Sequence, residues 1–368
     1  MRAVVFDAIG GPLTVRDVPE PECPPDAVVL DVRATGVCRS DWHAWSGHDP
    51  VALPHVPGHE FAGVVARVGA DVTAWHPGDR VTAPFVCGCG ACELCRAGDP
   101  QVCPDQTQPG FTHHGSFAEK VLVRAAEFNL VRLPDAMSFV AAAGLGCRVA
   151  TAYRALTAHG RLAAGEWLAV HGCGGVGLSA VLLGAALGAR VIAVDVSPDA
   201  LALAGARGAE AVLDASAVDA AGAIHEITGV GAHVSIDALG SPTTAVASVR
   251  SLRRRGRHVQ VGLLLGAAAT PPLPMDRVLA WELSLHGSHG IAAREYAALL
   301  DLIATAGLDP ATLIGRVVPL EEAGAALAAM DGPTPAGMTV VSLGADQPWS
   351  QSRTANASTS TSTSGSNR

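Results

Sequence analysis

One stretch near the middle of the chain, from Trp167 to Asp195, most constrains what this sequence can fold into. It starts with a short apolar strand, Trp167 to His171, and continues through a glycine-rich turn into an Ala/Leu-rich helix. A second apolar strand, Arg190 to Val194, follows the helix and ends at an acidic residue. Apolar strands that alternate with a helix predict a βαβ unit, whose two strands are parallel members of one sheet.

The glycines of this turn fit the G-x-G-x-x-G spacing of a dinucleotide-binding site. In such a turn the first glycine permits the tight bend, the second lets the backbone approach a pyrophosphate, and the last lets the helix pack close to the strand. Asp195 lies where a carboxylate would accept hydrogen bonds from the adenosine ribose. The alternative is a turn whose glycines serve packing alone. The predicted cofactor-binding residues here are Gly172, Gly174, Gly175, Val176, Gly177 and Asp195.

The composition of the 368 residues excludes several classes of function. A net charge of −9 argues against a protein that binds nucleic-acid phosphates. The apolar runs are too short and too often interrupted by glycine to span a bilayer, and the N-terminus has no signal-peptide pattern. We therefore expect a cytoplasmic protein without a membrane partner. In that compartment nine cysteines indicate metal binding or catalysis before disulfides.

Strand-like runs fill the first third of the chain, over 2–6, 12–18, 27–37, 61–68 and 80–84. Each is bounded by glycine or proline, which is typical of an antiparallel, turn-rich region. After the glycine turn, helical and strand-like segments alternate as in a doubly wound parallel sheet.

Three further segments carry structural expectations. Residues 148–162 and 294–307 are expected to be helical. Four arginines should end a helix before the next strand, where they would complement the helix dipole: Arg253, Arg254, Arg255 and Arg257. Residues 345–368 are polar, rich in serine and threonine and without apolar periodicity, so we expect them to be disordered.

Four cysteines in the first third have the spacing C-x2-C-x2-C-x7-C. Thiolates this close in sequence can complete a tetrahedral shell around Zn2+, and such a closed shell leaves no position for substrate. The predicted structural zinc ligands are Cys89, Cys92, Cys95 and Cys103. Cys87 stands beside the set without an assigned role.

A second set of metal-binding residue types is scattered along the chain. Cys38 opens the segment CRSDWH, His59 and Glu60 follow it, and Cys147 lies just before the dinucleotide half. Two thiolates and one imidazole would leave one position open for water or substrate, as a catalytic zinc requires. On spacing alone, a buried free cysteine and a turn histidine are more often structural.

The motifs GVCRSDWH, PGHEFAG, the cysteine quartet, HGSFAEKV, GLGCRVATAY and GCGGVGLSA occur here in this order. In that order they resemble the zinc-dependent alcohol dehydrogenases of the medium-chain dehydrogenase/reductase superfamily, from Met1 to about Leu343. The resemblance implies an α/β fold with a GroES-like, β-rich catalytic domain over 1–148 and 289–344. It also implies a Rossmann domain, a doubly wound parallel sheet that binds NAD, over 149–288.

The resemblance assigns roles around the second metal set. Cys38, His59 and Cys147 would hold the catalytic zinc, and Glu60 would sit beside the ion and coordinate it transiently. Asp41 matches a carboxylate that orients the ligand histidine. The implied cofactors are two Zn2+ ions per chain and NAD(H).

The implied reaction interconverts alcohols and aldehydes or ketones. Zinc stabilises an alkoxide, which transfers a hydride to the nicotinamide. Ser40 and His43 match the relay that passes the proton to solvent, since an imidazole titrates near neutral pH. Val261 and Leu263, with residues 238–240, match strand ends that flank the nicotinamide.

Cofactor choice and affinity follow from a few positions. Asp195 favours NAD over NADP, because a 2′-phosphate would face a carboxylate. The family often has a lysine where this chain has Ala200, and an arginine against the pyrophosphate where it has Met338. Both departures predict weaker cofactor binding unless another basic residue substitutes.

The substrate stays open at this level. Trp45 and Phe85 fall near positions that line the alcohol pocket in the family, and either could equally be core. A small alcohol or its aldehyde is the default substrate, and a polyol, formaldehyde or threonine dehydrogenase of the same superfamily is the alternative. A non-catalytic zinc or redox-sensing protein is a hypothesis of another class. The family also implies a homo-oligomer, dimer or tetramer.

Overall fold

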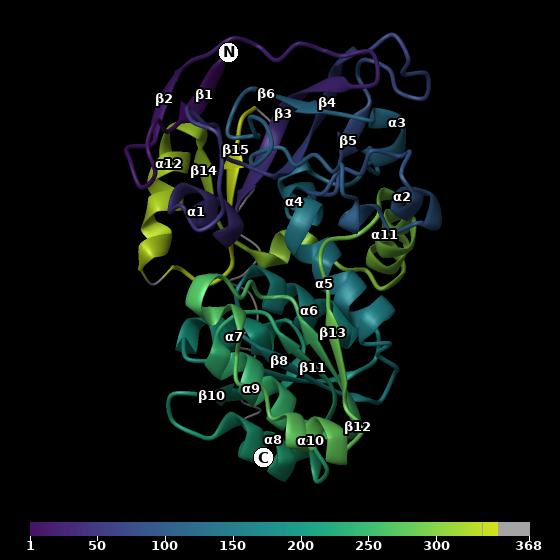
Figure 1. Ribbon diagram of the computed structural model, residues 1–368, viewed down its shortest axis with the longest axis vertical. Helices are drawn as coiled ribbons and strands as arrows, with labels where there is room; N and C mark the ends of the chain where they lie inside the picture. The colour runs from purple at the N-terminus through teal and green to yellow at the C-terminus, as the bar shows by residue number, and fades with distance from the viewer. Residues whose placement is uncertain (333, 345–368) are drawn as a thin grey trace, which may run out of the picture.

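Two sheets, one above the other, organise the computed structural model, which describes residues 1–332 and 334–344 (Figure 1). The upper lobe combines the N-terminal part of the chain with its last strands, whereas the middle of the chain forms the lower lobe. The tail over 345–368, expected to be disordered, lies outside the described residues. The domain boundaries proposed from the sequence stay a prediction.

The lower lobe contains a six-stranded parallel sheet with the order β10-β9-β8-β11-β12-β13. This is the strand order of a doubly wound, dinucleotide-binding sheet, and it confirms the predicted fold class. The central strand β8 is buried along its whole length, as its continuous apolar run predicts. The strands are β8 (Trp167–His171), β9 (Arg190–Asp195), β10 (Ala209–Asp214), β11 (Ala232–Asp237), β12 (Leu252–Gln260) and β13 (Ser284–Gly287).

Three of the helices between these strands, α7, α8 and α9, begin at side chains that cap them. Ser197, Asp219 and Ser241 each accept a hydrogen bond from the backbone N–H three residues later, which satisfies one of the free donors of the first turn. The helices are α6 (Gly175–Ala186), α7 (Pro198–Ala206), α8 (Ala220–Thr228), α9 (Pro242–Arg250) and α10 (Met275–Ala280).

The arginine cluster corrects one expectation. Helix α9 already ends at Arg250, and the four arginines lie within strand β12, so they do not complement a helix dipole. The pairing of β12 with β11 shifts register after Leu252, and Arg255 has a φ of 57° there. This irregularity lets the strand begin earlier than its apolar pattern indicates. Arg254 lies over the ring of Trp281 instead, 4.9 Å from its centroid.

The upper lobe contains a mainly antiparallel sheet with the order β14-β15-β3-β4-β5-β7, and β6 pairs with β3. The late strands β14 and β15 join the early strand β3, so the chain returns to its first lobe as the resemblance implies. A separate hairpin pairs β1 with β2. The strands are β1 (Arg2–Val5), β2 (Thr14–Asp17), β3 (Val28–Val37), β4 (Glu60–Val68), β5 (Arg80–Thr82), β6 (Lys120–Val123), β7 (Val131–Arg132), β14 (Ile314–Pro319) and β15 (Met338–Ser342).

The remaining helices surround this sheet or join the lobes. They are α1 (Arg39–Trp45), α2 (Glu93–Ala97), α3 (Ala126–Asn129), α4 (Phe139–Ala143), α5 (Ala150–Arg154), α11 (Tyr296–Thr305) and α12 (Leu320–Ala328). The short 3-10 turns are η1 (Pro100–Val102), η4 (Gly266–Ala269), η5 (Ala293–Glu295), η6 (Pro310–Leu313) and η7 (Ala329–Asp331). Within the described part of the chain, no helix has both the length and the apolar character needed to cross a membrane.

A continuous helical segment over 145–159 connects the two lobes, so the helix expected over 148–162 is present but begins and ends three residues earlier. Its first and last turns, η2 (Leu145–Val149) and η3 (Ala155–His159), are π-helical and lie directly before and after α5. The Tyr296 hydroxyl donates to the Leu145 carbonyl at 2.9 Å and anchors this segment to α11. A single apolar cluster extends from β3 and β4 through the connecting helix to β8 and β11, so the lobes share one core.

A buried chain of polar side chains crosses the lower sheet. Consecutive members hydrogen-bond to one another, and the last, Asp237, accepts from the backbone N–H groups of Leu239 and Gly240 at 3.0 Å. Burial lowers the pKa of His171 to about 3 and that of His258 to about 4. The members are His171, Ser251, Ser235, Ser248, His258, Gln260 and Asp237.

These two histidines predict that acid destabilises the fold. Below about pH 6.5 the unfolded chain protonates imidazoles that the folded chain keeps neutral. As the pH decreases below this value, the free energy of unfolding should therefore decrease too, by on the order of 1 kcal/mol per pH unit for each imidazole. Urea unfolding at pH 7, 6 and 5 measures the slope, and His258→Gln should reduce it by about one proton. Equal slopes for the two proteins would contradict the prediction.

The glycine turn predicts two different effects of an added methyl group. A Cβ at Gly177 would lie 1.7 Å from the Gly172 carbonyl oxygen, whereas a Cβ at Gly174 would meet no protein atom within 4 Å. Gly177→Ala should lower the free energy of unfolding by about 1–3 kcal/mol or more. Gly174→Ala, whose φ of −74° suits alanine, should stay within about 0.5 kcal/mol. Denaturant unfolding compares them, and equal losses would refute the packing argument.

Candidate active site

The scattered metal set of the sequence comes together at one buried point. Cys38 precedes helix α1, His59 and Glu60 lie where β4 starts, and Cys147 lies in the π-helical turn η2. One ligand atom from each of the four lies within 4.8 Å of the others, and all four residues are buried. Three segments that are far apart in the sequence therefore supply one site. For example, 88 positions separate Glu60 from Arg148, the residue after Cys147.

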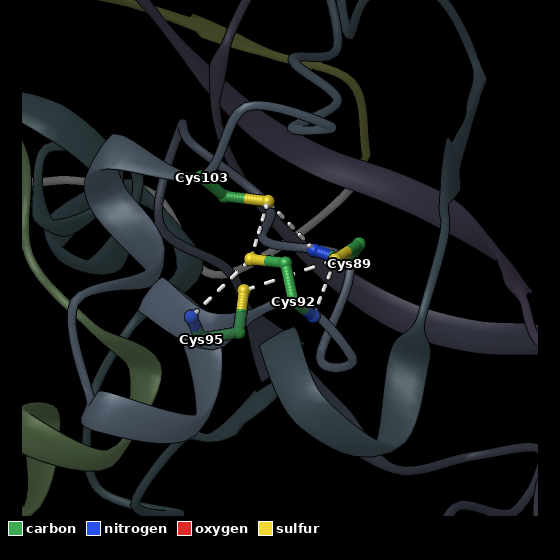
Figure 2. A group of neighbouring side chains, drawn as sticks. All are labelled: Cys89, Cys92, Cys95 and Cys103. Atoms are coloured by element: carbon green, nitrogen blue, oxygen red, sulfur yellow. Dashed lines mark hydrogen bonds between the residues drawn. The ribbon is translucent and has the colours of Figure 1, made fainter.

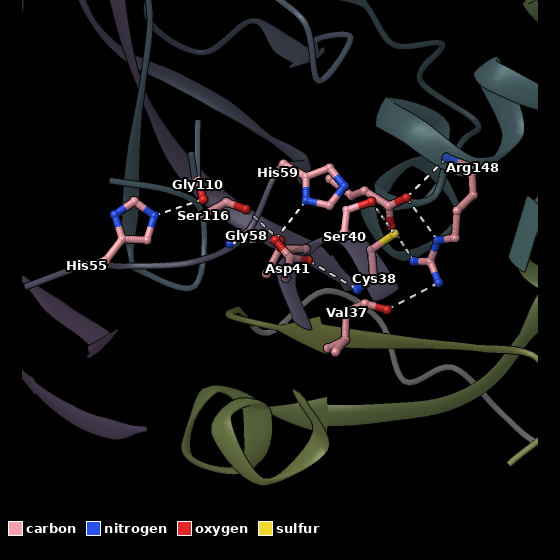
Figure 3. Close-up of polar contacts among 12 residues, drawn as sticks. Val37, Cys38, Ser40, Asp41, His55, Gly58, His59, Gly110, Ser116 and Arg148 are labelled. Atoms are coloured by element: carbon pink, nitrogen blue, oxygen red, sulfur yellow. Dashed lines mark hydrogen bonds and ion pairs between the residues drawn. The ribbon is translucent and has the colours of Figure 1, made fainter. Parts of the chain in front are cut away.

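The orientation of His59 is fixed by Asp41, as expected. The Asp41 carboxylate accepts from His59 Nδ1 at 2.7 Å and from the backbone N–H groups of Gly58 and Cys38 at 3.0 and 3.1 Å (Figure 3). His59 Nε2 is buried and has no hydrogen-bond partner among the described residues. An unpartnered ring nitrogen beside two cysteines fits a metal ligand, since buried polar atoms are otherwise hydrogen-bonded.

The two cysteines of this set differ in their proton affinity. A hydrogen bond from Cys147, together with the nearby His59, lowers the pKa of the Cys38 thiol well below its usual range. The same bond and burial raise the pKa of Cys147. A soft donor set of two sulfurs and one imidazole suits zinc.

Glu60 lies beside these ligands but is already engaged. Its Oε1 accepts from the backbone N–H and the Nε–H of Arg148 at 3.1 and 2.9 Å, and its Oε2 forms an ion pair with the same guanidinium. Burial raises the pKa of Glu60 to about 7, against the opposing effect of Arg148.

The expected proton relay lies on helix α1. Ser40 Oγ is 3.9 Å from the Cys38 sulfur, and His43 is half-buried one turn further along. His43 Nδ1 lies 3.1 Å from Nδ1 of the exposed His48. Burial, followed by the charges of His48 and Arg39, lowers the pKa of His43.

Aromatic rings line the metal set on one side. Phe85 packs edge-on to His59, with 5.8 Å between ring centroids. It also packs edge-on to His289, with 5.1 Å between ring centroids. Phe111 also packs edge-on to His59. Of the two residues considered for the alcohol pocket, Trp45 instead lies in the core beside the N-terminal hairpin, where its indole donates to the Gly11 carbonyl.

The cysteine quartet forms a compact cluster, in which α2 and its flanking loops direct four sulfurs toward one point (Figure 2). Cys92 and Cys103 sulfurs are 3.6 Å apart, and those of Cys89 and Cys95 are 4.0 Å apart. Zn–S bonds of about 2.3 Å in a tetrahedron place sulfurs roughly 3.8 Å apart. Backbone N–H groups of residues 91 and 92 donate to the Cys89 sulfur and lower its pKa to about 7.

The glycine turn lies between β8 and α6, and its glycines differ in their surroundings as expected. Gly172 has a φ of 91°, and space beside Gly174 is open. Asp195 accepts from the Cys173 N–H at 2.6 Å, so it fixes the turn in addition to its expected role toward the ribose. The two strand ends expected near the nicotinamide pack against each other: Gly240 is close to Leu263, and Val261 packs on the core.

Sequence reasoning missed three residues of this region. Arg148 lies within the motif GLGCRVATAY and has no role assigned from the sequence, yet it binds Glu60. His48 and His289 extend the site through His43 and Phe85. The proximity of His48 to His43 in the sequence was a readable signal, whereas nothing in the sequence pairs His289 or Arg148 with their partners.

Two family models match successive parts of the chain, and the first includes Cys38, His59 and Glu60. The alcohol dehydrogenase GroES-like domain matches residues 24–135, and the zinc-binding dehydrogenase domain matches residues 175–305. An alcohol dehydrogenase of Geobacillus stearothermophilus is 38% identical over 266 residues, which cover 72% of this chain and 78% of that protein.

Solved structures agree with these matches. The alcohol dehydrogenase of Thermus sp. ATN1 superposes with a TM-score of 0.86 at 30% identity, over 93% of this chain and all of that one. A structure described as an NAD-dependent alcohol dehydrogenase gives a TM-score of 0.85 at 31% identity, over 94% of this chain and all of that one. The chain belongs to the zinc-dependent alcohol dehydrogenases of the medium-chain dehydrogenase/reductase superfamily.

Proposed function

We propose that this chain interconverts alcohols and aldehydes or ketones with NAD(H), using one zinc ion held by Cys38, His59 and Cys147. The observation that carries the proposal is the convergence of these three buried side chains, with His59 Nε2 left without a partner. We further propose a second, structural zinc on the cysteine quartet, whose sulfur separations suit a tetrahedral ion.

The chain's own residues prepare the site for this chemistry. When bound, the zinc ion would act as a Lewis acid on the alcohol oxygen, and the nicotinamide would accept the hydride. Asp41 accepts a hydrogen bond from the Nδ1–H of His59 and thereby presents Nε2 to the ion in the required tautomer. Phe85 and Phe111 pack on the ligand imidazole and exclude water from it.

A proton released in the reaction needs a route out of the buried site. Ser40 Oγ, the polar atom of α1 beside the Cys38 sulfur, would accept it first. His43 would then hold it at a ring nitrogen and pass it to His48, which is exposed to solvent. This adds His48 to the relay that the resemblance implies.

NAD is the cofactor that we propose for the glycine turn. Open space at Gly174 leaves room for a pyrophosphate, and Asp195 would face the ribose hydroxyls. Ala200 and Met338 are buried, uncharged residues, so neither supplies the cation that the family often has at its position.

The substrate class that we propose is a small primary or secondary alcohol, because the aromatic rings of Phe85 and Phe111 pack against His59. Assays with NAD and a panel of simple alcohols, polyols, threonine and formaldehyde separate this class from the superfamily alternatives. No turnover of any simple alcohol would refute it. We also propose a cytoplasmic homo-oligomer, dimer or tetramer, and all nine free cysteines accord with a reducing compartment.

Two substitutions should separate the roles of the two zinc sites. His59→Ala removes a ligand beside the substrate, so we expect loss of one zinc per chain and a fall in kcat/KM of about a hundredfold or more. Cys92→Ser should also lower the zinc content by one, but its main effect should be a lower Tm. Metal analysis, initial rates and thermal unfolding measure the three quantities. Near-normal turnover by His59→Ala would rule out the proposed catalytic site.

Cofactor preference provides a separate test at Asp195. The unmodified protein should bind NADH more tightly than NADPH, because the carboxylate repels a 2′-phosphate. Asp195→Asn keeps one of the two acceptor oxygens of the turn but removes the charge, so the ratio of the Kd for NADPH to the Kd for NADH should fall by roughly tenfold. Fluorescence titration with each reduced cofactor measures the ratio. A preference of the unmodified protein for NADPH would contradict the assignment.

A further inference from the structure

Arg148 is the one arginine or lysine that is buried among the residues the structure describes, with 5% of its surface exposed. It directly follows the metal ligand Cys147 in the chain. A buried guanidinium costs free energy unless a charge balances it. Its partner is Glu60, which is also fully buried and directly follows the ligand His59.

The contacts of Arg148 occupy both oxygens of the Glu60 carboxylate. The backbone N–H and Nε–H donate to Oε1, and Nη2 reaches Oε2. Nη1 donates to the Val37 carbonyl at 3.3 Å, immediately before Cys38 (Figure 3). A two-pronged arginine–carboxylate pair of this kind fixes the carboxylate in one orientation.

Two glycines from different elements make room for this pair. A Cβ at Gly36 in β3 would lie 2.0 Å from Glu60 Oε2, and a Cβ at Gly175 in α6 would lie 2.3 Å from Arg148 Cδ. The Arg148 side chain therefore runs from the metal set to the first residue of the helix that follows the glycine turn. Met338, where the family has a cation, packs in the apolar core beside Gly144.

We propose that Arg148 is a positioning residue that holds the Glu60 carboxylate away from the zinc ion. This inference rests on the proposed function. A Glu60 oxygen lies within 4.8 Å of the three metal-binding atoms, so the carboxylate is close enough to move onto an ion there. Because each Glu60 oxygen accepts from Arg148, the carboxylate stays on the guanidinium and the fourth zinc position stays free for substrate.

The test uses the full chain with cobalt(II) at the catalytic site and zinc left in the quartet, because cobalt absorption reports coordination geometry. The unmodified protein should give the intense visible bands of a tetrahedral ion. In Arg148→Met the released carboxylate joins the ion, either in place of water or as a fifth ligand, so the bands should change in position or in intensity. In Arg148→Met/Glu60→Gln the original bands should return, because an amide is a poorer ligand than a carboxylate. Glu60→Gln alone is the matched control and should leave the bands unchanged.

Unchanged bands in Arg148→Met would overturn the proposal, as would a change in the bands that Glu60→Gln does not reverse. If Arg148→Met does not fold, Arg148→Lys replaces it with the same expectation, because lysine keeps the charge but loses the two-pronged contact. Failure of the unmodified protein to bind cobalt outside the quartet would refute the proposed function itself. Binding with bands that are insensitive to Arg148 would refute only the positioning role.

Discussion

Burial of ionisable groups at one point is the constraint on which the rest of this structure depends. Cys38, Asp41, His59, Glu60 and Cys147 lie together out of water, and such a set is costly unless charges and hydrogen bonds balance within it. Asp41 is satisfied by three N–H donors, and Glu60 by Arg148. What stays unpartnered is His59 Nε2 beside two sulfurs, which a divalent cation would satisfy.

The same constraint explains why the surrounding elements meet where they do. Strand β3 and its glycine bring Cys38 to the site, β4 brings His59 and Glu60, and the π-helical turn η2 brings Cys147. An ion pair between Arg154 of α5 and Asp99 attaches the loop of the cysteine quartet to the connecting helix, and Arg154 also pairs with Glu295 of η5. Arg294 donates to the Gly98 carbonyl and adds a further contact. A metal in the quartet would therefore support the connecting helix as well as its own loop.

How far the sequence could predict the structure depended on how local each signal was. The strand, turn and helix around Gly172 were predictable because their pattern is contiguous, and the quartet because its ligands are close together in sequence. Cys38, His59 and Cys147 were assigned only through a family resemblance, since their separation carries little information. Arg148 could not be assigned, because its contacts require three elements to approach closely at Gly36 and Gly175. The arginines of β12 were misplaced because a register shift in the pairing of β12 with β11, invisible in composition, lets the strand begin before its apolar run.

The apolar cluster shared by the two lobes has a consequence for recombining this protein with its relatives. A chimaera cut at the start of β8 would separate α5 and η2 from helix α6, against which they pack, and η3 from β12. Because η2 also carries Cys147 and Arg148, an exchanged nucleotide-binding half would alter the packing behind the metal ligands. Exchange of cofactor specificity by grafting would thus be least disruptive when confined to the β9–α7 turn, which lies outside the shared core and includes the exposed Val196.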